Sequence, residues 1–111
     1  MAEKLIPKRD KYQKSRGQPQ FLEIYCAQCQ VLVLVYQKDG PGQLKRLYLD
    51  RIFAPKELAE LQNSVGSIDE MRKLSCPNGH VLAFPMVYKP ENRLAYSLVS
   101  GSFGKKKSRN K

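Results

Sequence analysis

Residues that commonly bind transition metals through sulfur or imidazole are scarce in this sequence, which has three cysteines and one histidine among 111 residues. Tryptophan is absent. Three cysteines cannot all pair as intramolecular disulfides, which argues against a disulfide framework. No apolar run approaches the roughly 18 residues that identify a membrane-spanning helix, and the N-terminus lacks the apolar segment of a signal peptide. We therefore expect a small single-domain protein in the cytoplasm, a reducing compartment in which cysteines stay reduced.

Acidic residues are also few: ten Asp and Glu stand against 20 Lys and Arg, which gives a formal net charge of +10. The excess lies at the ends, because residues 1–20 carry +4 and residues 101–111 carry +5, whereas residues 21–100 carry only +1. Basic residues that neutralise phosphates release counterions and so bind polyanions without sequence preference. The charge pattern favours a nucleic-acid partner; the simpler alternative is that basic tails only keep the protein soluble.

The composition divides the chain into the same three segments as the charge distribution. Residues 1–20 are rich in Lys, Gln, Arg and Pro and show no apolar periodicity, so we expect a flexible basic N-terminal arm. Residues 101–111 are expected to form a basic C-terminal tail without a buried face. Residues 21–100 contain the apolar runs and are expected to form the folded domain.

Short runs of β-branched and aromatic residues predict strands within the domain. The most apolar of them, residues 30–37, predicts a central strand buried on both faces. A helix is expected to begin at Pro55, and Ser67 and Glu70 have the spacing of a capping box for a second short helix. We expect a mainly β fold of the α+β class, with an antiparallel sheet of about five to six strands and one or two short helices. The expected strands cover residues 21–25, 30–37, 44–53, 81–88 and 94–100.

All three cysteines and the histidine fall into two short motifs, Cys26-Ala27-Gln28-Cys29 and Cys76-Pro77-Asn78-Gly79-His80. Three thiolates and one imidazole match the closed tetrahedral ligand set of a structural zinc site. The sequence therefore predicts one structural Zn²⁺ bound by Cys26, Cys29, Cys76 and His80, with iron as an alternative metal for the same ligands.

Two chemical alternatives are less well supported by the motifs. A Cys-x2-Cys pair can be a redox motif, but Cys29 leads into a β-branched run instead of opening a helix. A catalytic zinc keeps an open coordination position and needs a general base. The only histidine is already a predicted ligand, and neither motif contains an acid, so we do not expect an enzyme.

The two motifs also share their surroundings, because each has an apolar residue two positions before its first cysteine and Val-Leu after its turn. In these features the chain resembles the zinc-ribbon family, in which two knuckles on β-hairpins share one zinc. The resemblance covers residues 21–36 and 73–88 and implies an elaborated zinc ribbon with the same four ligands. Two departures are the Cys-x3-His spacing of the second knuckle and the 46 residues between Cys29 and Cys76.

These observations predict a zinc-stabilised protein that binds nucleic acid through its basic arms. Structured RNA, or a ribonucleoprotein particle such as the ribosome, is favoured over DNA. The alternative is a protein–protein interaction module of a transcription complex or another large assembly. The candidate nucleic-acid contacts are Lys8, Arg9, Lys11, Lys14, Arg16, Lys45, Arg46, Lys105, Lys106, Lys107, Arg109 and Lys111.

Overall fold

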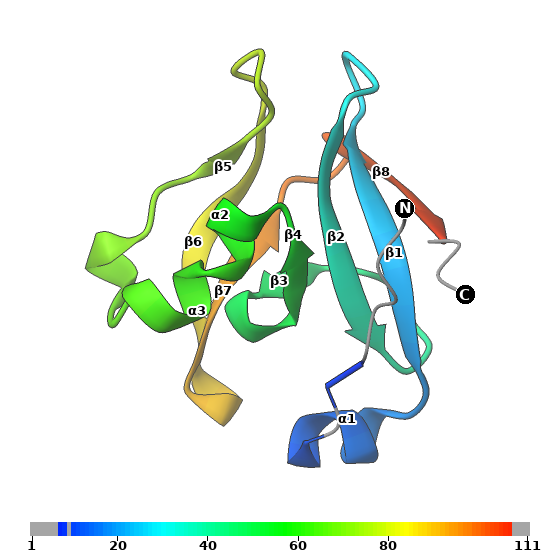
Figure 1. The fold of residues 1–111 in the computed structure, drawn as a ribbon, viewed down its shortest axis with the longest axis vertical. Helices are drawn as coiled ribbons and strands as arrows, with labels where there is room; N and C mark the ends of the chain where they lie inside the picture. Colours follow the sequence, from blue (N-terminus) through cyan, green and yellow to red (C-terminus); the bar gives the residue numbers. More distant parts are fainter. Residues whose placement is uncertain (1–6, 9, 108–111) are drawn as a thin grey trace.

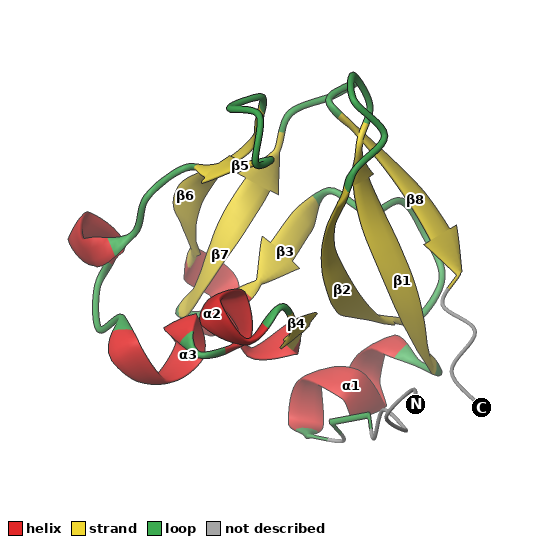
Figure 2. Ribbon diagram, turned by 45° about the horizontal axis from the view of Figure 1, so that its top comes forward, coloured by secondary structure: helices red, strands yellow, loops and turns green. Residues whose placement is uncertain are grey.

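The computed structural model describes residues 7–8 and 10–107 and shows a mainly β protein with a few short helices (Figures 1 and 2). The predicted fold class is confirmed. The strands number eight in the described residues, not five to six, and they form two four-stranded antiparallel sheets in place of one. No helix in this part of the chain is long and apolar enough to cross a membrane.

The first sheet has the strand order β4-β2-β1-β8. Its central strand β2 is buried on both faces: Leu34 and Tyr36 lie on one face, and Val33 and Gln37 on the other. This arrangement confirms the prediction for residues 30–37, and it follows from the dense valine and leucine content of that run. The four strands are β1 (Pro19–Cys26), β2 (Leu32–Asp39), β4 (Ile52–Ala54) and β8 (Phe103–Lys107).

The second sheet has the order β3-β7-β6-β5. Strand β5 pairs with β6 only as far as Ala83, so the part of β6 that contains Pro85 is open on that side. Proline cannot donate to a strand ladder, and an open edge is where a strand tolerates it. The strands are β3 (Arg46–Tyr48), β5 (Leu74–Ser75), β6 (Val81–Tyr88) and β7 (Arg93–Leu98).

The expected strand over residues 44–53 is interrupted. The 3-10 turn η1 (Leu49–Arg51) separates β3 in the second sheet from β4 in the first, so this segment crosses between the sheets. The crossing explains why neither face of the segment is wholly polar: Leu47, Leu49 and Ile52 are all buried in the shared core.

The helical region is also broken into shorter pieces than the sequence indicates. The helix expected to begin at Pro55 ends at Ala59 and a second turn starts at Leu61. The capping-box position forms a 3-10 turn, in which the Glu70 carboxylate accepts a hydrogen bond from the Ser67 N–H at 3.1 Å. Besides η1, the helical elements are α1 (Lys11–Arg16), α2 (Lys56–Ala59), α3 (Leu61–Ser64), η2 (Ile68–Glu70) and η3 (Lys89–Glu91).

One apolar cluster joins the two sheets. Ile24 and Leu34 of the first sheet and Leu47, Leu82 and Ala83 of the second belong to it, and each is at most 1% exposed. Burial of an aliphatic side chain such as these contributes roughly 1.5–3 kcal/mol. The apolar cluster is small, so we expect other contacts to hold the two sheets together at their ends.

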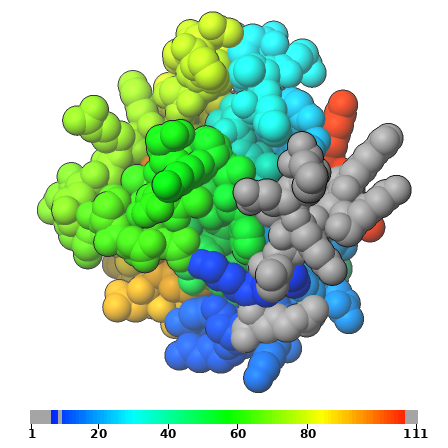
Figure 3. Space-filling model, in the orientation of Figure 1, coloured from blue at the N-terminus to red at the C-terminus, as the bar shows by residue number. Residues whose placement is uncertain are grey.

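Residues 10–20 are folded against the body, in contrast to the expected flexible arm. Helix α1 begins after Asp10, whose Oδ1 accepts hydrogen bonds from the N–H groups of Tyr12 and Gln13 at 3.1 Å each. Strand β1 then begins at Pro19. In Figure 3 this N-terminal segment (blue) covers the lower end of the molecule.

A buried arginine explains why this segment is folded. Arg51 is 1% exposed, and its guanidinium donates to Asp10 Oδ1 at 2.6 Å and to Asp39 Oδ2 at 2.9 Å. A buried charge without partners is costly, so the Asp10 carboxylate, although itself 40% exposed, ties the start of α1 to Arg51. Composition alone does not reveal this pairing, because the partner of Asp10 lies 41 residues away.

Helix α1 also reaches the second sheet. Arg16 forms an ion pair with Glu91 in η3, at the turn between β6 and β7. The Tyr12 ring lies 4.2 Å from the Arg93 guanidinium, and Arg93 is bound in turn to Asp50 and Glu91. The N-terminal helix therefore bridges the two sheets.

The C-terminal segment differs from its prediction as well. Residues 103–107 form β8, which pairs antiparallel with β1 from Cys26↔Phe103 to Leu22↔Lys107. Phe103 is partly buried against the core, and the pairing satisfies an edge of β1 that would otherwise be open. Residues 1–6, 9 and 108–111 of the expected arms lie outside the described residues.

The Asp10–Arg51 pair makes a pH-dependent contribution to stability. Although burial opposes it, hydrogen bonding to Arg51 and Gln13 lowers the pKa of Asp10 to about 2, from an ordinary 3.8. Because the folded-state pKa is depressed, the contribution is present above about pH 4 and is lost as the pH falls through about 2. Asp10→Asn, which keeps the helix cap, should lower the free energy of unfolding by about 1 kcal/mol at pH 7.

Urea unfolding of the wild type and Asp10→Asn, each across this pH range, tests the expectation. Asp10→Ala should cost about 1 kcal/mol more than Asp10→Asn, since it also removes the cap. A wild-type advantage over Asp10→Asn that persisted unchanged at pH 2 would contradict the ion-pair interpretation.

Gly40 allows the close approach of α1 to the β2 end. Its φ is +78°, and a Cβ there would lie 2.0 Å from the carbonyl oxygen of Arg16. Gly42 also has a positive φ, +109°, but a Cβ there meets nothing within 4 Å. Gly42→Ala should therefore cost only the backbone strain, about 1–2 kcal/mol, and Gly40→Ala distinctly more. Thermal unfolding of the two variants measures the difference. Equal losses of stability in both would show that the contact of Gly40 with Arg16 is unimportant.

Candidate metal centre

The first ligand pair lies in the turn between β1 and β2. Cys26 is the last residue of β1, and its N–H donates to the Val31 carbonyl at 2.9 Å. The Gln30 N–H donates back to the Cys26 carbonyl at 2.9 Å, and Gln30 has a positive φ of 62°. The tight turn that results directs Cys26 and Cys29 to the same side.

The second pair lies in the turn between β5 and β6 and is built in the same way. The Cys76 N–H donates to the His80 carbonyl at 2.9 Å, and the Gly79 N–H donates to the Cys76 carbonyl at 2.9 Å. Gly79 has φ +87°, in agreement with the backbone freedom that a glycine provides at this turn. Because β5 and β6 belong to the second sheet, each sheet supplies one half of the centre.

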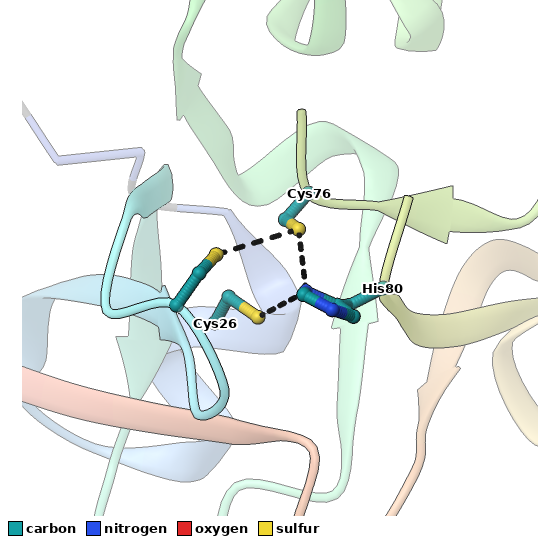
Figure 4. A group of neighbouring side chains, drawn as sticks. Cys26, Cys76 and His80 are labelled. Atoms are coloured by element: carbon teal, nitrogen blue, oxygen red, sulfur yellow. Dashed lines mark hydrogen bonds between the residues drawn. The ribbon is translucent and has the colours of Figure 1, made fainter. Parts of the chain in front are cut away.

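The four predicted side chains converge. The Cys26 and Cys76 sulfurs lie 3.5 and 3.3 Å from His80 Nδ1, and the Cys29 and Cys76 sulfurs are 3.6 Å apart (Figure 4). All four ligand atoms lie within 4.8 Å of one another, with Cys26 and Cys76 buried. The cluster could therefore hold one metal ion, and Figure 3 shows the two turns, cyan and yellow-green, in contact at the upper end.

The second turn also acts on a ligand of the first. A hydrogen bond from the Asn78 side chain, together with one from the Val31 N–H, lowers the pKa of Cys29 to about 6. A thiol with this pKa is largely deprotonated at pH 7, and the thiolate is the form that binds metal. Sequence reasoning treated Asn78 only as a turn residue, because its contact with Cys29 depends on the meeting of the two turns.

The predicted nucleic-acid contacts divide into groups in the structure. Lys11, Lys14 and Lys45 are exposed, as are the three lysines of β8. Others are engaged: Lys8 donates to Gln62, Arg16 pairs with Glu91, and the Arg46 guanidinium lies 4.3 Å from the Tyr88 ring centroid. Arg9, Arg109 and Lys111 lie outside the described residues.

Two residues that matter were missed. The sequence does not distinguish Arg51 from the other basic residues, yet it is buried and paired. Lys38 ends the apolar run of β2 and carried no signal of its own, but the fold places it beside the β8 lysines. In both cases the partner comes from a distant part of the chain.

Comparison of the chain with family models, curated proteins and solved structures gave no match. A metal site is therefore inferred from the geometry of the four side chains.

A metal ion bound by all four side chains would hold the two sheets together at this end, and its loss should separate them. A structural zinc contributes roughly 10–16 kcal/mol of apparent binding free energy in small peptides, comparable to the roughly 5–15 kcal/mol stability of a whole domain. Removal of metal with a chelator, or Cys76→Ser, should abolish the cooperative thermal transition seen by far-UV circular dichroism. Retention of the full wild-type transition after verified metal removal would contradict this role.

Proposed function

We propose that this protein is a zinc-stabilised nucleic-acid-binding protein whose partner is structured RNA, alone or in a ribonucleoprotein particle such as the ribosome. The main supporting observation is the distribution of charge. Asp10, Asp39, Asp50 and Glu91 are all committed to ion pairs with arginines, whereas most lysines among the described residues remain exposed.

Zinc is the metal that this ligand set suits best. Zn–S bonds of about 2.3 Å and Zn–N bonds of about 2.0–2.1 Å in a tetrahedron give ligand separations of about 3.8 Å between sulfurs and about 3.5 Å between sulfur and nitrogen. The Cys29–Cys76 sulfur separation of 3.6 Å, and the 3.5 and 3.3 Å from the Cys26 and Cys76 sulfurs to His80 Nδ1, are close to these values. All four ligand atoms lie within 4.8 Å of one another. Tetrahedral thiolate-rich sites are typical of zinc and also suit iron.

The site is proposed to be structural. Four protein ligands fill a tetrahedral coordination sphere, so a bound zinc has no open position for a water or a substrate. The centre then serves to fix the β1–β2 turn against the β5–β6 turn, which positions the surfaces of both sheets.

The ion pairs leave a surface that attracts phosphate. Each acid that binds a buried arginine is withdrawn from the exposed lysines, so the positive charge is not locally neutralised. RNA is favoured over duplex DNA because α1, the longest helix in the described residues, has only six residues. A helix of this length is poorly suited to reading bases in a major groove, and recognition by shape and backbone charge fits better.

A protein partner is the second candidate. A groove of about 780 Å³ runs between α2, α3 and β5, and the exposed Leu32 lies on its wall at 46% exposure. Its charges are balanced, because its lining includes Glu57 and Glu70 as well as Arg72 and Lys73, so it does not favour a polyanion. This groove supports the interaction-module alternative.

Binding of the full-length, zinc-loaded protein to three labelled probes tests the RNA proposal: an RNA hairpin, its unpaired strand and a DNA duplex. We expect the tightest binding to the hairpin, with the logarithm of the association constant falling by about 0.7–0.9 per phosphate contact for each tenfold rise in salt. Elemental analysis of the same sample should find one zinc per chain.

Weak and equal binding to all three probes would indicate non-specific attraction and would contradict the proposal. A partner protein that co-purifies and is lost on Leu32→Asp, while RNA binding is absent, would favour the interaction module.

A further inference from the structure

The three lysines of β8 do not share one surface. Residues opposite each other in a sheet point to the same face, and successive residues alternate. Lys105 is opposite Ile24 and Lys107 is opposite Leu22, so both point to the inner face of the first sheet. Lys106 is opposite Glu23 and points to the outer face, where its ammonium lies 5.3 Å from the Tyr25 ring centroid.

Lys38 lies on the same face as Lys105 and Lys107. It is opposite Gln20, which alternates in step with Leu22 on β1. Lys38, Lys105 and Lys107 line a hollow of about 280 Å³ together with the loop of residues 40–42. We call this feature the Lys38 hollow. It combines residues from three places that are far apart in the sequence.

The Lys38 hollow has uncompensated positive charge. No acidic residue lines it, and the neighbouring Asp39 carboxylate is bound to Arg51 and Gln37. Lys38 Nζ is held at the hollow by donation to the Gly40 carbonyl at 2.6 Å, which leaves two of its three N–H donors available. Burial and the charge of Lys105 lower the pKa of Lys38, although the charge of Asp39 opposes this shift.

The basic surface continues beyond the hollow. A second depression shares Lys38 and Pro41 with it and is also lined by Lys45 and Arg46, and by Arg16, which is paired with Glu91. The only acid in that lining is again the committed Asp39. Successive cations along one path match the repeating charges of a nucleic-acid backbone.

We propose that Lys38, Lys105 and Lys107 form a phosphate-binding site for the backbone of the RNA partner, built on the folded body. The site rests on the proposed RNA-binding function and refines it. The lysines of β8 act as an ordered, one-sided set in which Lys106 does not take part, and Lys38 belongs to the site although it lies in neither basic arm.

Single substitutions Lys38→Gln, Lys105→Gln, Lys107→Gln and Lys106→Gln in the full-length zinc-loaded protein test the site, with the labelled RNA hairpin as the probe. Each of the first three should reduce the salt slope by about 0.7–0.9 and weaken binding about five- to eightfold at about 0.1 M salt. Lys106→Gln removes the same charge from the same strand and should change binding less than twofold. The thermal transition confirms that each variant is folded.

A second set of variants separates a local site from total charge. In the triple variant at Lys38, Lys105 and Lys107, the salt slope of RNA binding should fall by about 2–3. A control triple variant at Lys56, Arg72 and Lys73, which are all exposed, should keep a salt slope and an affinity near those of the wild type. Equal losses in the two triple variants, or a loss for Lys106→Gln equal to that for Lys105→Gln, would overturn the site while leaving RNA binding intact. Absence of wild-type binding to the hairpin would overturn the proposed function itself.

Discussion

The fold depends on the meeting of two hairpin turns that belong to different sheets. Cys26 and Cys29 come from the first sheet and Cys76 and His80 from the second, so a metal bound by all four would connect the sheets at one end. The apolar core between the sheets is small, and such a connection replaces contacts that a larger protein would obtain from additional layers. Asn78 of the second turn also lowers the pKa of Cys29 in the first, which favours the thiolate form.

The opposite end is closed by ion pairs. Arg51, in the segment that crosses between the sheets, binds Asp39 of β2 and Asp10 at the start of α1. Helix α1 then reaches Glu91 and Arg93 beside the β6–β7 turn. Figure 1 shows the two turns at the top and α1 at the bottom, so the sheets are held at both ends by different chemistry. Because the buried Arg51 requires carboxylate partners, its pairing with Asp10 holds the N-terminal segment against the body.

This architecture changes how the excess charge is displayed. Four acids, Asp10, Asp39, Asp50 and Glu91, are used in ion pairs with arginines. Strand β8 holds its lysines at fixed positions on the two faces of a sheet. A flexible tail would present its charges interchangeably, whereas a strand separates them by position. The proposed RNA contact is accordingly a property of a surface, and it depends on the same sheet that carries half of the metal centre.

The sequence by itself determined the four candidate metal ligands, the mainly β class and the buried central strand, because each depends on a local pattern. These patterns are the spacing of Cys26 and Cys29, that of Cys76 and His80, and the valine-rich run of residues 30–37. Tertiary structure decided the rest. The division into two sheets depends on the crossing of the chain at η1. The folding of residues 10–20 against the body depends on Arg51, which lies 41 residues from its partner Asp10. Lysines 105–107 form a strand because β1 offers an open edge. Local composition cannot reveal such pairings, since their free energy comes from partners that only the folded chain brings together.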